Sequence, residues 1–118
     1  LNNIMYIYKA KCIKVVDGDT VDAQVDLGFD THKIIRIRLV GINAPESRTR
    51  DLEEKVRGLA AKARVKELLK EHKNIFVLKS QGVGKFGRCL GEIYLGEVKL
   101  NDILITEGHA VAYYGGKR

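Results

Sequence analysis

This sequence of 118 residues has little of what marks several large classes of protein. Its only cysteines, Cys12 and Cys89, lie far apart in the chain and have no CxxC or Cys/His spacing around them. Their separation argues against a structural zinc site and a redox motif, so we interpret both residues as buried or neutral thiols. At this length a modest core forms without disulfide bonds, and we expect a single domain over residues 1–118.

Long apolar runs are also absent. No stretch approaches the roughly 20 apolar residues of a membrane-spanning helix, so we expect a soluble protein that does not contact membranes. The first residues, LNNIMYIYKAKC, lack a basic region followed by an apolar stretch and a cleavage site. They therefore contain no signal peptide, which fits a cytoplasmic protein and equally the mature form of a secreted one.

Positive charge is what the sequence has in excess. The 21 Lys and Arg residues outnumber the 15 Asp and Glu residues, which gives a net charge of +6. Such a balance favours a polyanionic partner such as nucleic acid. Many basic domains bind no polyanion, so charge alone does not decide the question.

Alternating apolar and polar residues predict five strands, at residues 5–16, 20–27, 33–42, 74–79 and 88–95. The turn signal Asp17-Gly18 joins the first two strands in a hairpin. Arg36 and Arg38 share one face of the third strand. The glycine-rich segment QGVGKFGR (residues 81–88) is predicted to be a mobile hairpin loop between the last two strands.

Two helices are predicted, a long one at residues 51–72 and a short one at residues 101–107. The apolar face of the long helix is expected to consist of Leu52, Val56, Leu59, Ala60, Ala63 and Leu68. Three strands, a helix, two strands and a helix, without repeats or a linker, favour a five-stranded OB-fold barrel, a mainly β protein of the α+β class. A generic α+β sandwich is the competing fold.

Two acids and two arginines lie at strand ends or beside turns, where a barrel gathers side chains at one mouth: Asp19, Arg38, Glu46 and Arg88. Phosphodiester hydrolysis needs this set. A carboxylate takes a proton from an attacking water, and guanidinium groups bind and stabilise phosphate oxygens. Taken singly, each residue has a plainer interpretation as a turn residue, a helix cap or a surface ion pair.

The segment VGINAPES (residues 40–47) contains the only proline of the chain. Pro45 fixes its own φ and biases Ala44 toward an extended conformation, which would direct the Ala44 carbonyl and the Glu46 side chain toward one point. A hard divalent cation requires oxygen ligands, and Asp19, the Ala44 carbonyl and the Asn43 amide can provide them.

Three segments, VVDGDT, RLVGINAPE and KFGRCLGEIY, resemble in order and spacing the signature segments of the staphylococcal nuclease (thermonuclease) family. The resemblance extends over nearly the whole chain. It implies an OB-fold barrel with helices, and calcium-dependent endonuclease activity on DNA and RNA that leaves 3′-phosphate products. We expect a monomer that binds one Ca²⁺ ion.

The resemblance also implies roles for single residues. Asp19 resembles the calcium-binding aspartate, and Ala44 would contribute its backbone carbonyl to the metal. Arg38 and Arg88 resemble the two phosphate-binding arginines, and Glu46 resembles the proposed general base.

Substrate contacts are implied in two further places. Lys85 matches a lysine near the terminal phosphate of the nucleotide, and Phe86 matches an aromatic ring that faces the substrate. Tyr113 and Tyr114 fall where the family uses tyrosines against the base. A cation and a ring on a glycine-flanked loop also suit nucleotide binding on physical grounds.

The chain departs from the family pattern at Asn43, where the best-known members have a second calcium-binding aspartate. Calcium affinity depends on the charge of the ligands, so we expect a weaker metal site. Asp22 on the second strand is expected to add charge nearby.

Two other functions remain open. The chain could be a catalytically silent module that binds nucleic acid on the same fold, or a structural or protein-interaction module. Digestion of denatured DNA with calcium and with EDTA separates the first from a nuclease, and absence of any binding at low salt would favour the second.

Overall fold

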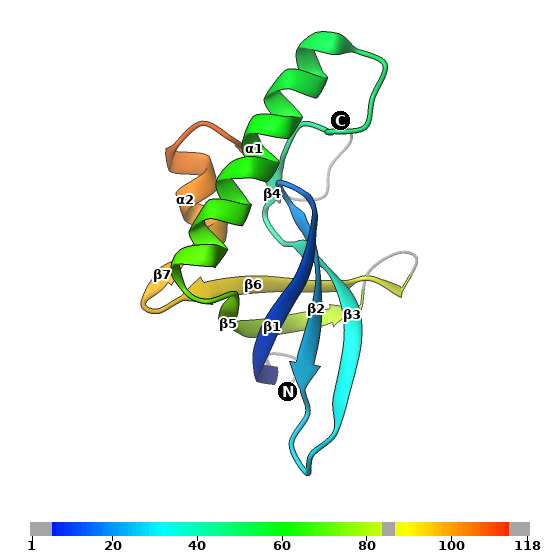
Figure 1. The fold of residues 1–118 in the computed structure, drawn as a ribbon, viewed down its shortest axis with the longest axis vertical. Helices are drawn as coiled ribbons and strands as arrows, with labels where there is room; N and C mark the ends of the chain where they lie inside the picture. Colours follow the sequence, from blue (N-terminus) through cyan, green and yellow to red (C-terminus); the bar gives the residue numbers. More distant parts are fainter. Residues whose placement is uncertain (1–5, 84–86, 114–118) are drawn as a thin grey trace.

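The computed structural model describes residues 6–83 and 87–113. Five strands form a closed barrel: β1 (Tyr6–Asp17), β2 (Thr20–Asp26), β3 (His32–Leu39), β5 (Ile75–Val83) and β6 (Cys89–Leu95). Their order is β3-β2-β1-β5-β6 with antiparallel neighbours, and a parallel pairing of β3 with β6 closes the barrel. This arrangement confirms the predicted OB-fold and excludes an open sandwich (Figure 1).

The helices and the short strands lie around this barrel. Helix α1 (Leu52–Glu71) crosses one end of it with α2 (Leu100–Thr106) nearby, while the β2–β3 hairpin extends from the other end (Figure 1). Strand β7 (Val98–Lys99) pairs with β6, and β4 (Ile42–Asn43) pairs with β8 (Val111–Ala112). Among the described residues, neither helix is long and apolar enough to span a membrane.

The predicted alternation of β2 is confirmed. Val21, Ala23 and Val25 are buried in the barrel, and β2 pairs with β1 from the Asp17-Gly18 turn onward. The fully buried core also contains Ile37 of β3, Leu78 of β5 and further apolar residues of β6 and the two helices. Burial of these side chains is the main favourable term for the fold.

Helix α1 begins as the sequence predicts, but it buries a different face. The Asp51 carboxylate caps the helix by accepting hydrogen bonds from the N–H groups of Glu53 and Glu54. Apart from Leu68, the predicted apolar face is wrong, since its other members are exposed: Leu52, Val56, Leu59, Ala60 and Ala63. The helix instead buries Gly58, Ala61, Val65, Leu68 and Leu69.

Two predicted boundaries also differ. The third strand ends at Leu39 because Gly41 takes a φ of +82°, which turns the chain before Ile42 and Asn43 form β4. Strand β5, which corresponds to the fourth predicted strand, continues to Val83. Residues 81–83 of the predicted loop therefore belong to β5. A register shift between Ser80 and Gly82 accommodates this extension.

Candidate active site

Asp19 occupies the centre of the candidate site. It follows the tight turn between β1 and β2 and is only 7% exposed. Its Oδ1 accepts a hydrogen bond of 3.0 Å from the Thr20 hydroxyl, and its Oδ2 accepts one of 2.9 Å from the backbone N–H of Ala44. A buried carboxylate needs such donors to offset the loss of hydration. The contact with Ala44 joins the DGDT turn to the proline turn.

Arg38 binds the same two segments from β3. Its Nη1 donates to the carbonyls of Leu39 and Ile42 at 2.7 and 2.9 Å. Its Nη2 lies 3.4 Å from Asn43 Oδ1 and 3.5 Å from Asp19 Oδ2. The guanidinium therefore closes the turn after β3, and the Asp19 and Asn43 oxygens converge on one of its nitrogens.

Glu46 is held by its backbone, while its side chain is exposed. Its N–H donates to Glu54 Oε2 of α1 at 3.0 Å. The next residue, Ser47, is 2% exposed and donates from both N–H and Oγ to the Asp17 carboxylate. The Glu46 carboxylate thus projects from a fixed turn two residues beyond Ala44.

Arg88 stands immediately before β6 and is half-buried. Leu90, two residues further on, is the register partner of Arg38 in the parallel pairing of β3 and β6. This pairing brings the start of β6 alongside the strand that carries Arg38. The topology therefore places the chain at Arg88 near Arg38, although the two are distant in sequence.

The substrate-contacting residues are placed only in part. Tyr113 is half-buried, and its N–H donates to the Gly41 carbonyl at 2.9 Å, beside the turn that carries Asn43. Lys85, Phe86 and Tyr114 lie outside the described residues, so their predicted roles stay predictions.

Asp22 does not add an unbalanced charge to the site. Arg36 binds its carboxylate through two hydrogen bonds, from Nε to Oδ1 at 2.8 Å and from Nη2 to Oδ2 at 3.1 Å. Hydrogen bonding by this guanidinium lowers the pKa of Asp22 below its usual value. The charges of Asp22 and Arg36 therefore balance each other on the strand surface. Asp22 is not the additional negative charge that the sequence led us to expect near the metal site.

Two supporting residues escaped the sequence analysis. Asn101, 3% exposed, donates from its amide to the Val40 carbonyl at 2.8 Å and accepts from the Ile93 N–H at 3.2 Å. Asp17 looked like an ordinary turn residue, yet it anchors Ser47. The available signals were an Asn at the predicted start of the short helix and the first Asp of DGDT.

The oxygen donors around Asp19 suit a hard divalent cation. Asp19 and Asn43 present oxygens to one point, which is the Arg38 Nη2. Only one of the two is a carboxylate, and the described residues contain no cluster of three or more His, Cys, Asp or Glu side chains suited to a metal. The donor set therefore fits one cation with low ligand charge, and Ala44 can add its carbonyl.

Comparison with known proteins agrees with this fold. Residues 36–118 match the family described as Staphylococcal nuclease homologue, and the chain belongs to this family of nucleases. The match begins within β3, so Asp19 lies outside it. The placement of Asp19 in the site rests on its contacts with Ala44 and Arg38.

Individual relatives point the same way. An uncharacterized endonuclease of Escherichia coli O157:H7 is 30% identical over 87% of this chain and 60% of its own length. Thermonuclease of Staphylococcus hyicus is 29% identical over 88% of this chain and 59% of its own. Protein ParB of Escherichia coli is 26% identical over 89% of this chain and 57% of its own length. The chain thus spans about three fifths of the length of these relatives.

Proposed function

We propose that this chain is a divalent-cation-dependent endonuclease that hydrolyses DNA and RNA to products with a 3′-phosphate. The observation that carries the proposal is the convergence of Asp19, Arg38 and Asn43, together with the exposed Glu46 on the turn that follows Asn43. Membership of the nuclease family and the net charge of +6 support a polyanionic substrate.

In the proposed reaction, Glu46 takes a proton from a water molecule, and the water oxygen attacks the phosphorus. The bond between phosphorus and the 5′ oxygen breaks, and the departing oxygen takes a proton from solvent water, which leaves a 3′-phosphate on one product and a 5′-hydroxyl on the other. Because Glu46 is exposed, its carboxylate is accessible to water, and the contact of its N–H with Glu54 fixes the backbone that carries it.

Arg38 and Arg88 bind the scissile phosphate in this proposal. Arg38 shares its Nη2 between Asn43 and Asp19. When these two oxygens hold a cation, Nη2 can donate to a phosphate oxygen instead. Arg88 approaches from the start of β6 and stabilises charge on the phosphate and the leaving oxygen.

Calcium is the proposed cation, held by Asp19, Asn43 and the Ala44 carbonyl. When bound, it would neutralise charge on the phosphate and orient the attacking water. Lys85, Phe86, Tyr113 and Tyr114 are proposed to contact the nucleotide. Stacking on an aromatic side chain accepts any base, which agrees with a substrate range that includes DNA and RNA.

The test is digestion of denatured DNA and of RNA with calcium, with other divalent ions and with EDTA. We expect cleavage with calcium, none with EDTA, and 3′-phosphate ends on the products. Binding without cleavage under every metal would reject the nuclease.

That outcome would favour the second candidate, a silent nucleic-acid-binding module. One observation favours this candidate. Asp19 is the one carboxylate among the proposed metal ligands, and the Arg38 guanidinium already approaches it at 3.5 Å. A cation must therefore compete with an existing ion pair.

A further inference from the structure

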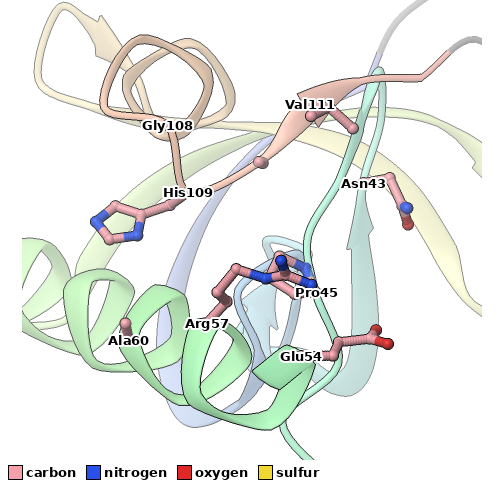
Figure 2. Close-up of a pocket in the computed structure, with 9 residues that line it drawn as sticks. Asn43, Pro45, Glu54, Arg57, Ala60, Gly108, His109 and Val111 are labelled. Atoms are coloured by element: carbon pink, nitrogen blue, oxygen red, sulfur yellow. The ribbon is translucent and has the colours of Figure 1, made fainter. Parts of the chain in front are cut away.

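A groove next to the candidate active site has no role in the proposed reaction. It has a volume of about 610 Å³ and lies between α1, the turn after Asn43 and residues 108–111 (Figure 2). Sites for small molecules and cofactors commonly measure about 300–1,000 Å³. The groove is therefore large enough for a nucleotide.

Asn43 lines both this groove and the candidate metal site. Its amide oxygen lies 3.4 Å from Arg38, and Pro45 lines the groove directly after Ala44. In Figure 2, Asn43 and His109 lie on opposite sides of the groove. The groove and the candidate metal site therefore adjoin along the segment from Asn43 to Pro45.

Arg57 of α1 supplies a positive charge there. Its side chain extends from the helix toward Pro45 (Figure 2). Within residues 6–83 and 87–113, no carboxylate forms an ion pair with Arg57, in contrast to Arg36 and Arg64. The acid of the groove, Glu54, already accepts the Glu46 N–H at 3.0 Å. Arg57 therefore has donors available for an anion.

We propose that the groove is a second nucleotide subsite, in which Arg57 binds the phosphate of the nucleotide next to the scissile one. The inference rests on the proposed function. A guanidinium binds phosphate oxygens through paired hydrogen bonds. Pro45 and Ala60 give the groove apolar walls, and the His109 ring offers a surface on which a base can stack.

The test measures binding of a fluorescent single strand of about 12 nucleotides, a typical length for an OB-fold site. Anisotropy titrations are run in EDTA, where the proposed nuclease does not cleave, between about 20 and 200 mM salt. Arg57→Gln is compared with Lys55→Gln, which removes the same charge from the same helix outside the groove. Circular dichroism checks that both variants fold.

Arg57→Gln is expected to lower the slope of log affinity against log salt by about 0.7, the value for one phosphate contact on a single strand. When the salt concentration falls tenfold, the affinity of the variant therefore increases about fivefold less than the affinity of the parent. Lys55→Gln should change the slope by much less. Equal effects of the two variants would overturn the subsite and leave the proposed function standing.

A parent protein that binds no strand would overturn the proposed function together with the subsite. A second pair of variants keeps the test open if Arg57→Gln fails to fold. Ala60→Glu places a carboxylate in the groove, whereas Ala63→Glu places one on the exposed helix outside it. The subsite predicts weaker binding for Ala60→Glu than for Ala63→Glu, and equal binding would reject it.

Discussion

Gly58 of α1 lies directly against the backbone of Glu46. A Cβ atom at position 58 would stand 2.2 Å from the Glu46 carbonyl oxygen and 2.7 Å from the Ser47 nitrogen. No side chain fits there without movement of the helix or the turn. In an exposed helix position Gly→Ala adds stability, by about 0.5–1 kcal/mol. Here we expect the opposite sign, a loss of about 1–3 kcal/mol from overpacking.

The same Gly58→Ala change is expected to slow cleavage about tenfold to a hundredfold, because it displaces the turn that carries Glu46. Cleavage rates and denaturant unfolding measure the two effects. Gly96→Ala is a useful comparison, because its Cβ would meet nothing within 4 Å although its φ of +66° is strained. Gly96→Ala should lose stability and keep its cleavage rate. A Gly58→Ala protein as active as the parent would show that this contact does not position Glu46.

Asn43→Asp is expected to tighten metal binding. It places a second carboxylate beside Asp19, and calcium affinity rises with the charge of its ligands. We expect affinity to increase on the order of tenfold, measured by calorimetric titration of calcium. Gln24→Glu, which adds the same charge at an exposed position of β2, is the control. Unchanged affinity in Asn43→Asp would place the cation elsewhere.

Asn101→Ala tests the support of the turn behind Arg38. The substitution leaves the Ile93 N–H without its side-chain acceptor and the Val40 carbonyl without its side-chain donor. Unsatisfied buried groups of this kind cost about 1–3 kcal/mol each. Urea unfolding should therefore show a loss of about 2 kcal/mol or more. A loss below about 0.5 kcal/mol, usual for surface changes, would contradict the network.

The two helices are joined by an ion pair that depends on pH. Arg64 of α1 binds the Glu107 carboxylate from Nε at 2.7 Å and Nη2 at 2.9 Å. These hydrogen bonds lower the pKa of Glu107 from its ordinary 4.5. The contribution to stability is therefore complete above pH 4.5 and is lost as the pH falls through the lower value of the folded state.

Glu107→Gln removes this contribution. The difference in unfolding free energy between parent and variant should be largest at neutral pH and should shrink below pH 4.5. Unfolding at a series of pH values measures it, and the exposed Glu97→Gln serves as a control. A difference that stays constant down to the acid limit would mean that the Arg64 pair does not stabilise the fold.

Local patterns predicted most of the barrel. The alternation around Val21 and Ile37 and the Asp17-Gly18 turn are signals within a few residues, and they determine which face of each strand is buried. The helix face was not predictable in the same way. Hydrophobicity favoured Leu52 and Val56, but the close approach of α1 to the proline turn selects Gly58, and its approach to Gly18 selects Ala61. Backbone proximity leaves little trace in hydrophobic periodicity.

The candidate site was likewise predictable only in part. Asp19, Arg38 and Asn43 came from their residue types and the resemblance, and the structure brings their side chains into contact. Their supports depend on long-range contacts. Asp17 anchors Ser47 thirty positions away, and no spacing rule connects such a pair. Arg57 gave no signal at all, because one cation among 21 basic residues has nothing to distinguish it.

The most direct measurement of the central claim is the cleavage rate of denatured DNA by Glu46→Gln, compared with Glu71→Gln. Glu71 is exposed at the far end of α1, so it controls for the loss of one charge. With calcium present and folding verified, Glu46→Gln is expected to lose at least about a hundredfold in rate, as for removal of a general base. Glu71→Gln should cleave like the parent. Equal rates in the two variants would contradict the assignment of Glu46 and the site built around it.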